Sequence, residues 1–220
     1  MMNAALLDLD GTLVDTEREN AESVARALAR VGRPMSAEER EFVIGHGWRE
    51  IYDLLEHNRP TGMTYDALKH AAALEKEKIL REKGLVVLPG AKAALARLAD
   101  RGGVAIVTGS SREESELVLE LMGVRELVDA LVTAEDVPHG KPAPDGFLLA
   151  SERLGVLPPG CLAVEDSEAG IRAARDAGMR CVAVRAGNFA KQSQAEADVV
   201  IDTLDQLDDA LIERLMVRMA

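Results

Sequence analysis

Short runs of apolar and β-branched residues alternate along this chain with amphipathic stretches of helical periodicity, and this alternation is its strongest constraint on the fold. Candidate strands are "AALLDLD" at 4–10, "VAIVTG" at 104–109, "ALVTAED" at 130–136, "CLAVED" at 161–166, "CVAVR" at 181–185 and "DVVID" at 198–202. Helical patterns between them include residues 90–102 and 168–178, the second ending at Gly178 as a left-handed C-cap. Such alternation predicts βαβ crossovers and an α/β fold, with a mostly parallel sheet covered on both faces.

One segment interrupts the alternation. Residues 16–86 carry no strand pattern, only helical patterns over residues 17–32, 36–45, 48–58 and 64–84. We therefore expect an α/β core domain of residues 1–15 and 87–220, with a helical domain of residues 16–86 inserted into it. Pro89 in the return linker "VLPGA" ends the strand-like entry before the next helix.

Composition narrows the class of protein. With 220 residues, 47% of them hydrophobic, the chain can bury the core of one large domain or of one and a half. The net charge of −12 works against non-specific binding to nucleic acid or anionic lipid, although a local pocket can still bind an anion. The opening "MMNAALLDLD" lacks a secretory pattern and no run of 18 apolar residues occurs, so we expect a cytoplasmic, soluble protein. Cys161 and Cys181 lie in strand-like stretches without metal or redox spacing, which predicts core thiols.

The first candidate site is the string Asp8-Leu9-Asp10-Gly11-Thr12 at the end of the first strand. Because side chains alternate along a strand, Asp8 and Asp10 leave it on the same side while Leu9 points into the core. Two such carboxylates need a cation or a shared proton, and Gly11 allows the sharp turn that separates them. A cap or turn would explain one aspartate but not the whole string.

Two further strand ends carry groups suited to an anion. Thr108-Gly109-Ser110-Ser111 close the strand "VAIV" and lead into a helix, where a hydroxyl, a flexible backbone and a helix N-terminus favour negative charge. Taken alone, Ser110 or Ser111 would be a helix cap. Lys141 in "HGKPAPD" lies between Gly140 and Pro142, outside any helix interior. A surface lysine is the usual reading, but this loop position predicts a fixed cation near the anion site.

A second acidic pair, Glu165-Asp166, follows the strand "CLAV". Together with Asp8 and Asp10 it supplies enough oxygen ligands for a hard divalent ion, and Mg²⁺ accepts a few carboxylates, a carbonyl, waters and a phosphate oxygen. The alternative is that Asp166 or Ser167 caps the helix "SEAGIRAAR".

In order and spacing, "DLDGTLVDT", the threonine of "VTGSS", the lysine of "GKPAPD" and "VEDSEAGIRAARDAGM" resemble the signature motifs of the haloacid dehalogenase superfamily. The resemblance spans essentially the whole chain and implies a Rossmann-like doubly wound parallel sheet with an inserted all-helical cap domain. The helical segment resembles the cap of the subgroup that contains β-phosphoglucomutase, phosphonoacetaldehyde hydrolase and many small-molecule phosphatases.

The resemblance implies roles for individual residues. Asp8 would be the nucleophile that becomes an aspartyl-phosphate, and Asp10 the general acid and base. Mg²⁺ would be held by the ligands Asp8, the Asp10 backbone carbonyl, Asp166 and, directly or through water, Glu165. The transferring phosphoryl group would be held by the residues Thr108, Gly109, Ser110 and Lys141.

The cap stretch "VIGHGWREIYDLL" resembles the substrate-specificity loop of β-phosphoglucomutase and its relatives. The expected specificity residues are His46, Gly47, Trp48 and Arg49, with Arg49 as an anion contact and Trp48 as an apolar wall. The alternative places Trp48 in the cap core and Arg49 on a solvated face.

The resemblance leaves several activities to weigh. Asp10 argues against a dehalogenase, because the dehalogenases of this family lack it. Asn20 and Ile44 stand where the mutases carry a histidine and a lysine, which favours a phosphatase over a β-phosphoglucomutase-like sugar phosphomutase. The lysines of residues 64–84 lie in what we interpret as a solvated helix, which disfavours a phosphonoacetaldehyde hydrolase, and a silent phospho-ligand binder would not need both aspartates.

We therefore expect a magnesium-dependent phosphatase of a small phosphorylated metabolite, with a small-molecule phosphate ester as its partner. The ester is expected to be a sugar or sugar-acid monophosphate. Neither nucleic acid nor a membrane is expected as a partner, and the chain is expected to be a monomer or weak homodimer.

Overall fold

The computed structural model describes residues 2–188 and 191–217, and the chain divides into two compact units. The core unit comprises Met1–Asp15 and Val86–Ala220, and the cap unit is Thr16–Leu85. Among the described residues, no helix combines the length and the apolar character needed to cross a bilayer.

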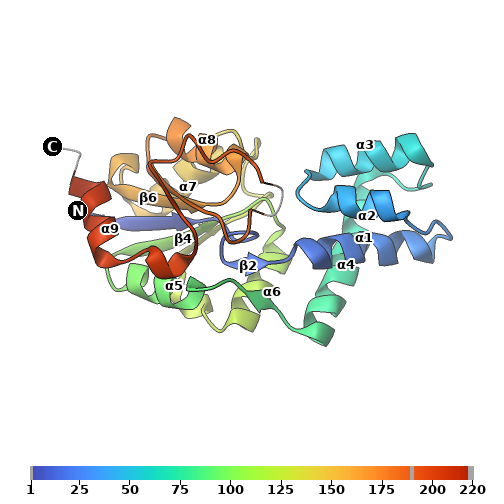
Figure 1. The fold of residues 1–220 in the computed structure, drawn as a ribbon, viewed down its shortest axis with the longest axis horizontal. Helices are drawn as coiled ribbons and strands as arrows, with labels where there is room; N and C mark the ends of the chain where they lie inside the picture. The colour runs from blue at the N-terminus through green and yellow to red at the C-terminus, as the bar shows by residue number, and fades with distance from the viewer. Residues whose placement is uncertain (1, 189–190, 218–220) are drawn as a thin grey trace. The chain divides into compact units, whose positions relative to one another are not determined.

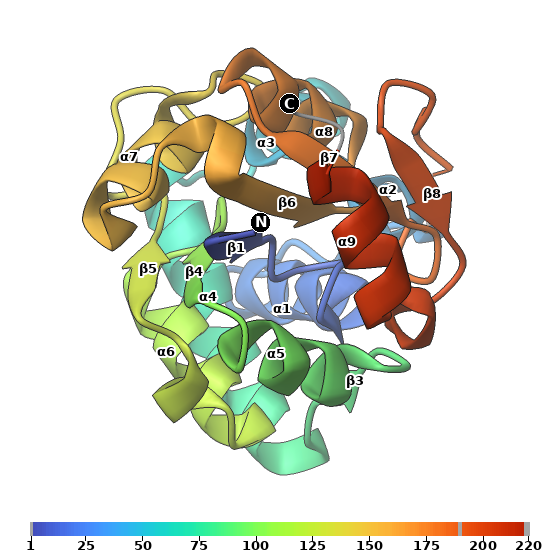
Figure 2. The ribbon, with the colours of Figure 1, turned by 90° about the vertical axis from the view of Figure 1, so that its left-hand side faces the viewer.

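A parallel sheet forms the centre of the core unit, with the strand order β5-β4-β1-β6-β7-β8 in the described part of the chain (Figure 2). Its strands are β1 (Ala4–Leu7), β4 (Gly103–Val107), β5 (Ala130–Val132), β6 (Cys161–Glu165), β7 (Arg180–Val184) and β8 (Val199–Ile201). The predicted α/β class and parallel sheet are confirmed. Each predicted strand starts within one residue of the observed start. The predicted ends of β1 and β5 are too late, because residues 8–10 and 133–136 already lie beyond the strands.

Helices cover both faces of this sheet (Figures 1 and 2). One face carries α5 (Ala91–Ala99), α6 (Arg112–Met122) and α9 (Asp209–Val217), and the other carries α7 (Asp145–Leu154) and α8 (Glu168–Asp176). Short 3₁₀ turns lie at Arg125–Leu127, Pro158–Gly160 and Leu204–Gln206. Gly178 follows α8 with φ +80°, and Met179 N donates to Ala174 O, so the predicted left-handed helix end is confirmed.

The double cover explains the continuous apolar strands. All residues of β1 are 0% exposed, because alternate side chains face helices on opposite sides. Leu6 packs with Phe147 in the cluster under α7 and α8. Cys161 and Cys181 are buried and free, as predicted for core thiols.

A small antiparallel sheet lies where the chain leaves and re-enters the core unit. It pairs β2 (Val14–Asp15) with β3 (Val86–Val87), and Leu88 N donates to Leu13 O at 2.9 Å. The sequence does not predict this pair, because a two-residue strand is too short to show periodicity. Val86, expected in a helical segment, is therefore in a strand.

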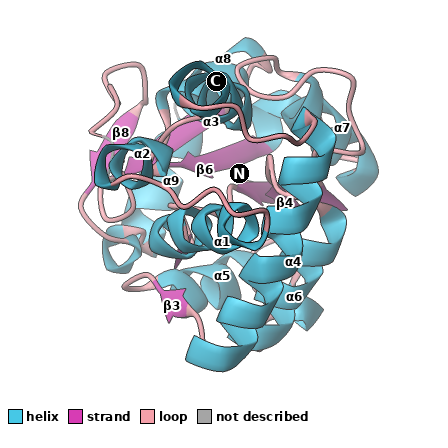
Figure 3. Ribbon diagram, turned by 90° about the vertical axis from the view of Figure 1, so that its right-hand side faces the viewer, coloured by secondary structure: helices cyan, strands magenta, loops and turns pink. Residues whose placement is uncertain are grey.

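The regular secondary structure of the cap unit, Thr16–Leu85, is all helical, with loops between the helices (Figure 3). It consists of α1 (Glu17–Arg30), α2 (Ala37–Val43), α3 (Trp48–Asn58) and α4 (Tyr65–Lys83). Val24, Leu28, Leu55 and Leu68 form its core and are fully buried. The interpretation of residues 64–84 as a solvated helix is wrong in part, because Lys76 in α4 is only 4% exposed.

The strand order indicates where a ligand would bind, at the carboxyl end of β1. From β1 the chain passes to β4 and β5 on one side and then crosses to β6 on the other. In open α/β sheets, ligands bind beyond the carboxyl ends of strands where the winding reverses. That place is the loop that follows Leu7.

Candidate active site

Asp8 is the first residue beyond β1 and lies between the ends of two neighbouring strands. Leu7 is paired with Ile106 of β4 and with Val164 of β6. The Asp8 amide donates to Val164 O at 2.9 Å, and the side chain is buried, with the residue 6% exposed. The parallel register therefore brings together residues that lie far apart in the sequence.

The turn after Asp8 depends on glycine. Gly11 has φ +84°, which suits glycine, and its amide donates to Val14 O at 2.8 Å. A Cβ on Gly11 would lie 2.4 Å from Asp166 Oδ2, and one on Gly187 would lie 1.7 Å from Gly11 O. The loop after β7 thus packs directly against this turn, a contact that the local sequence pattern does not indicate.

Lys141 reaches the same place from the loop after β5. Its Nζ lies 2.5 Å from Asp8 Oδ1, 2.5 Å from Glu165 Oε1 and 2.8 Å from Val107 O. The predicted fixed cation is therefore in contact with both acidic strand ends. Burial disfavours its charge, but Asp8 and Glu165 outweigh burial and raise the pKa of Lys141.

Glu165 and Asp166 have different surroundings. Glu165 is 0% exposed, and its Oε2 accepts hydrogen bonds from the Ser167 amide and hydroxyl and from the Asp166 amide. Asp166 is only partly buried and accepts from Thr12 Oγ1 at 3.3 Å. Ser167, not Asp166, caps α8, since its side chain accepts from the Gly170 amide.

The acidic residues fit a divalent ion. One carboxylate oxygen from each of Asp8, Glu165 and Asp166 can be chosen so that all lie within 4.8 Å of one another. Three carboxylates face the single cation Lys141, so the group has an excess of negative charge and offers only hard oxygen donors. Both carboxylate oxygens of Glu165 are engaged, Oε1 by Lys141 and Oε2 by amides, whereas Lys141 contacts Oδ1 of Asp8, so Asp8 and Asp166 are the better placed ligands.

The same excess of charge perturbs the titration of the group. Burial raises the pKa of Asp8 to about 7, with Glu165 adding to the rise and Lys141 opposing it. Burial also raises the pKa of Asp166, and Asp8 adds to that effect. A cation bound between these carboxylates would favour their ionised forms.

The turn after β4 holds three of the predicted phosphate-binding residues, Thr108, Gly109 and Ser110. Thr108 is buried, and Gly109 is exposed with open space where a Cβ would lie. Ser110 Oγ donates to Asp10 Oδ2 at 2.7 Å, and Thr108 Oγ1 lies 3.4 Å from the same oxygen. Ser111 is the cap of α6, because it accepts from the Glu114 amide. The predicted residues are brought together, but Ser110 contacts Asp10.

The predicted cap residues lie in the cap unit. The exposed His46 ring stacks on Phe42 with ring centroids 3.9 Å apart. Trp48 packs against the cap core, and Gly47 precedes α3. The exposed Arg49 guanidinium lies 4.3 Å from the centroid of the Tyr65 ring.

Comparisons with known proteins agree with this arrangement. Residues 2–178 match the haloacid dehalogenase-like hydrolases. The validoxylamine A 7′-phosphate phosphatase of Streptomyces hygroscopicus subsp. limoneus is 34% identical, over 94% of this chain and 96% of its own. The fructose-1-phosphate phosphatase YqaB of Escherichia coli is 36% identical, over 82% of this chain and 95% of its own.

Solved structures share the fold. The crystal structure of CbbY from Rhodobacter sphaeroides in complex with phosphate has a TM-score of 0.84 and 28% identity, covering 94% of this chain and 96% of that chain. A putative β-phosphoglucomutase from Thermotoga maritima has a TM-score of 0.76 and 26% identity, covering 96% and 99%. The match along most of the chain, together with the strand-end residues described above, shows that this protein belongs to the haloacid dehalogenase-like hydrolases.

Proposed function

We propose that the chain is a magnesium-dependent phosphatase that hydrolyses a small phosphorylated metabolite, a sugar or sugar-acid monophosphate. The observation that carries the proposal is the contact of Lys141 with Asp8 at 2.5 Å beside the carboxylates of Glu165 and Asp166. A buried carboxylate held by a cation and flanked by metal-type donors suits nucleophilic attack on a phosphate ester. Relatives named as phosphatases of phosphorylated carbohydrates support the choice of substrate class.

In the first step, a carboxylate oxygen of Asp8 attacks the phosphorus atom. The new oxygen–phosphorus bond forms as the bond to the leaving alkoxide breaks, and Asp10 gives its proton to that alkoxide. The product is an aspartyl-phosphate on Asp8 and a free alcohol. Thr108, the Gly109 amide and Lys141 would hold the oxygens of the phosphoryl group during transfer.

In the second step, Asp10 is ionised and takes a proton from a water molecule. The water oxygen attacks phosphorus, the bond to Asp8 breaks, and inorganic phosphate leaves with Asp8 restored. Glu165 Oε1 lies 2.5 Å from Lys141 Nζ, and this contact helps to keep the cation close to Asp8.

Magnesium would be held by Asp8, the Asp10 backbone carbonyl and Asp166, with Glu165 beside them. When bound, it would offset the charge of these carboxylates and of a phosphoryl oxygen. His46, Gly47, Trp48 and Arg49 of the cap remain the predicted specificity residues.

The second candidate is a sugar phosphomutase, favoured by the structural similarity to a putative β-phosphoglucomutase. A mutase must let a sugar hydroxyl compete with water for the phosphoenzyme. Asn20 and Ile44, where mutases carry a histidine and a lysine, favour water and so the phosphatase.

The two candidates are separated by a screen of phosphorylated metabolites with Mg²⁺, run with and without a sugar bisphosphate. Release of inorganic phosphate without the bisphosphate is expected. Isomerised sugar phosphate that forms only when the bisphosphate is added would overturn the phosphatase in favour of the mutase.

Asp8→Asn tests the nucleophile. The substitution keeps the shape of the side chain but removes its charge, so turnover of every active substrate should fall by about a thousandfold or more while the circular dichroism spectrum stays native. Unchanged turnover would refute the assignment of Asp8.

A further inference from the structure

The hydroxyl of Ser110 lies closer to the Asp10 carboxylate than that of Thr108 does, and Asp10 is the residue to which the proposed function assigns proton transfer. Ser110 Oγ donates to Asp10 Oδ2 at 2.7 Å, whereas Thr108 Oγ1 is at 3.4 Å, the limit of a hydrogen bond. We propose that Ser110 is a positioning residue that sets the orientation of the Asp10 carboxyl group for proton transfer to the leaving group. This inference rests on the proposed phosphatase function and assigns Ser110 a role other than phosphate binding.

The backbone around Ser110 is held on both sides. Its amide donates to Thr108 Oγ1 at 3.1 Å, and its carbonyl accepts from the Ala134 amide at 3.2 Å. The next residue, Ser111, caps α6. The turn thus joins the ends of β4 and β5 to a helix start, and it presents the Ser110 hydroxyl from a fixed place.

The geometry of a carboxyl group gives this contact its consequence. A hydroxyl bound to one carboxyl oxygen restricts rotation about the bond to the carboxyl carbon, and this fixes the plane in which the other oxygen lies. Asp10 lies three positions beyond the end of β1 and is only partly buried, whereas Asp8 is buried. A serine hydroxyl can donate to the ionised carboxylate and accept from the protonated acid, so one contact serves both states.

The neighbouring hydroxyl has a different task. Thr108 is buried and accepts the Ser110 amide, which orients its hydroxyl within the turn. Thr108 and the Gly109 amide remain available as phosphoryl contacts in the proposed mechanism. In the proposed mechanism Thr108 therefore contacts the phosphoryl group, whereas Ser110 makes the closer hydrogen bond to Asp10.

The experiment uses esters whose leaving groups differ in their need for a proton. A nitrophenolate leaves without protonation, a phenolate needs it more, and an alkoxide needs it most. We measure kcat/KM, which covers the steps up to phosphoenzyme formation, for 4-nitrophenyl phosphate, phenyl phosphate and fructose 1-phosphate. The enzymes are the wild type, S110A, S110T, D10N and S110A/D10N, all saturated with Mg²⁺.

If Ser110 positions Asp10, S110A loses about tenfold to a hundredfold on the alkyl ester and less than about threefold on 4-nitrophenyl phosphate, a part of the effect of a general acid. S110T, which keeps the hydroxyl, has the wild-type ratio of kcat/KM between the esters. In the D10N background, S110A no longer changes that ratio, because the group it positions has lost its function.

S111A is the matched control. It removes a hydroxyl from the adjacent residue and weakens the start of α6, so any loss should be equal for the three esters. The apparent inhibition constant of inorganic phosphate is measured for each variant as a second readout.

Equal loss on all esters with weaker inhibition by phosphate would make Ser110 a phosphate ligand and overturn the proposal. Unchanged kinetics of S110A would overturn it as well. If S110A does not fold, S110T provides the test. The proposal would be overturned if the ratio of kcat/KM between the alkyl and nitrophenyl esters changed as much in S110T as in D10N. Inactivity of the wild type on every ester would instead refute the proposed function.

Discussion

At the scale of single residues, the buried charged side chains of the site stabilise one another through direct contacts. Lys141 is shared between Asp8 and Glu165, and Glu165 is fully buried. Burying one charge without a partner costs several kcal/mol, so each member of this group depends on the others. Small residues beside the group leave room for the carboxylates, and Gly170 is the clearest example.

Gly170→Ala should therefore destabilise the protein, although alanine is the better helix former. A Cβ at this position in α8 would lie 2.0 Å from the Glu165 carboxyl group. Helix propensity favours alanine by about 1 kcal/mol, whereas overpacking costs about 1–3 kcal/mol. We expect the free energy of unfolding, measured with urea, to be lower than that of the wild type, and kcat to be lower as well.

Arg172→Ala is the control for Gly170→Ala. It places alanine in the same helix at an exposed position, where only a 3.4 Å contact with Glu168 is lost. Its stability should stay within about 0.5 kcal/mol of the wild type. Equal stability of the two variants would show that Glu165 tolerates the added methyl group.

Asp136 supports a pH-dependent contribution to stability. Burial opposes its charge, but Arg153, Thr133 and Arg112 outweigh burial and lower its pKa to about 2. Because the folded pKa is below the unfolded value of about 3.9, this stabilisation is complete above pH 4 and is lost as the pH falls toward 2. Asp136→Asn should cost about 2 kcal/mol at pH 7.

Urea unfolding of Asp136→Asn and wild type at several pH values checks this. The difference between the two proteins should shrink below pH 4. Asp100→Asn, at an exposed position, serves as the control and should differ little from the wild type. A difference that stays constant with pH would contradict the assigned ionic contacts.

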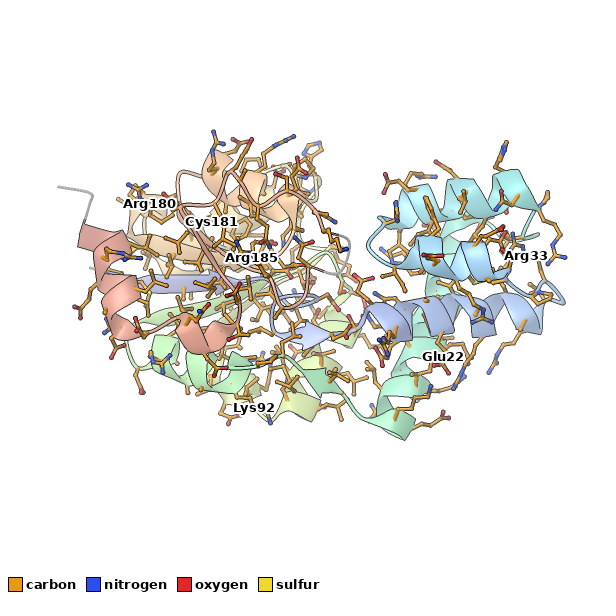
Figure 4. The ribbon with its side chains drawn as sticks, viewed as in Figure 1. Glu22, Arg33, Lys92, Arg180, Cys181 and Arg185 are labelled. Atoms are coloured by element: carbon orange, nitrogen blue, oxygen red, sulfur yellow. The ribbon has the colours of Figure 1, made fainter. Side chains whose placement is uncertain are left out.

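At the scale of elements, burial explains both the strands and the inserted helices. Strands covered on both faces are largely apolar, which makes β1, β4 and β6 easy to find in the sequence, although β6 ends in the buried Glu165. The cap helices instead surround one apolar cluster, and a buried ion pair joins their ends. Arg33, labelled in Figure 4, binds both carboxylate oxygens of Glu39 at 2.8 and 2.9 Å, and each residue is 5% exposed.

Glu39→Ala should unfold the cap helices more readily. It leaves Arg33 buried without its carboxylate partner and removes the acceptor of the Ser36 amide at the start of α2. Loss of one partner of a buried pair costs about 3–5 kcal/mol. Hydrogen exchange of amides in residues 17–83 should become faster.

Glu38→Ala is the control, because Glu38 is the exposed neighbour in the same first turn. The double variant Arg33→Met with Glu39→Leu should recover much of the lost stability, since it removes both charges at once. If Glu39→Ala exchanges no faster than Glu38→Ala, the ion pair does not stabilise the cap.

At the scale of the whole molecule, the core unit and the cap unit have separate apolar clusters, so perturbations of one need not affect the other. Ligand that binds only the folded core should stabilise that unit by mass action.

Mg²⁺ should raise the stability of the wild type, by about 2.7 kcal/mol at a free concentration of about a hundred times its Kd. Asp166→Asn should remove this gain and, without Mg²⁺, should be at least as stable as the wild type, because one of three mutually repelling carboxylates is gone. Thermal unfolding with Mg²⁺, with EDTA and with KCl at matched ionic strength measures both effects. An equal gain in Asp166→Asn would exclude this residue as a ligand.

The local pattern of the chain is sufficient to predict the α/β class, the strand starts, the helices of the cap and the clustering of Asp8, Lys141 and Asp166. Strand periodicity, helix caps and the carboxyl-end rule for parallel sheets are all properties of short segments or of their order. Particular contacts between residues far apart in the chain cannot be predicted from such local patterns. Ser110 and Asp10 are separated by 100 positions, and the packing of Gly187 on Gly11 joins two loops. Such contacts follow from strand register and loop packing, which depend on the whole folded chain, and they decide that Ser110 faces Asp10 and that Glu165 faces Lys141.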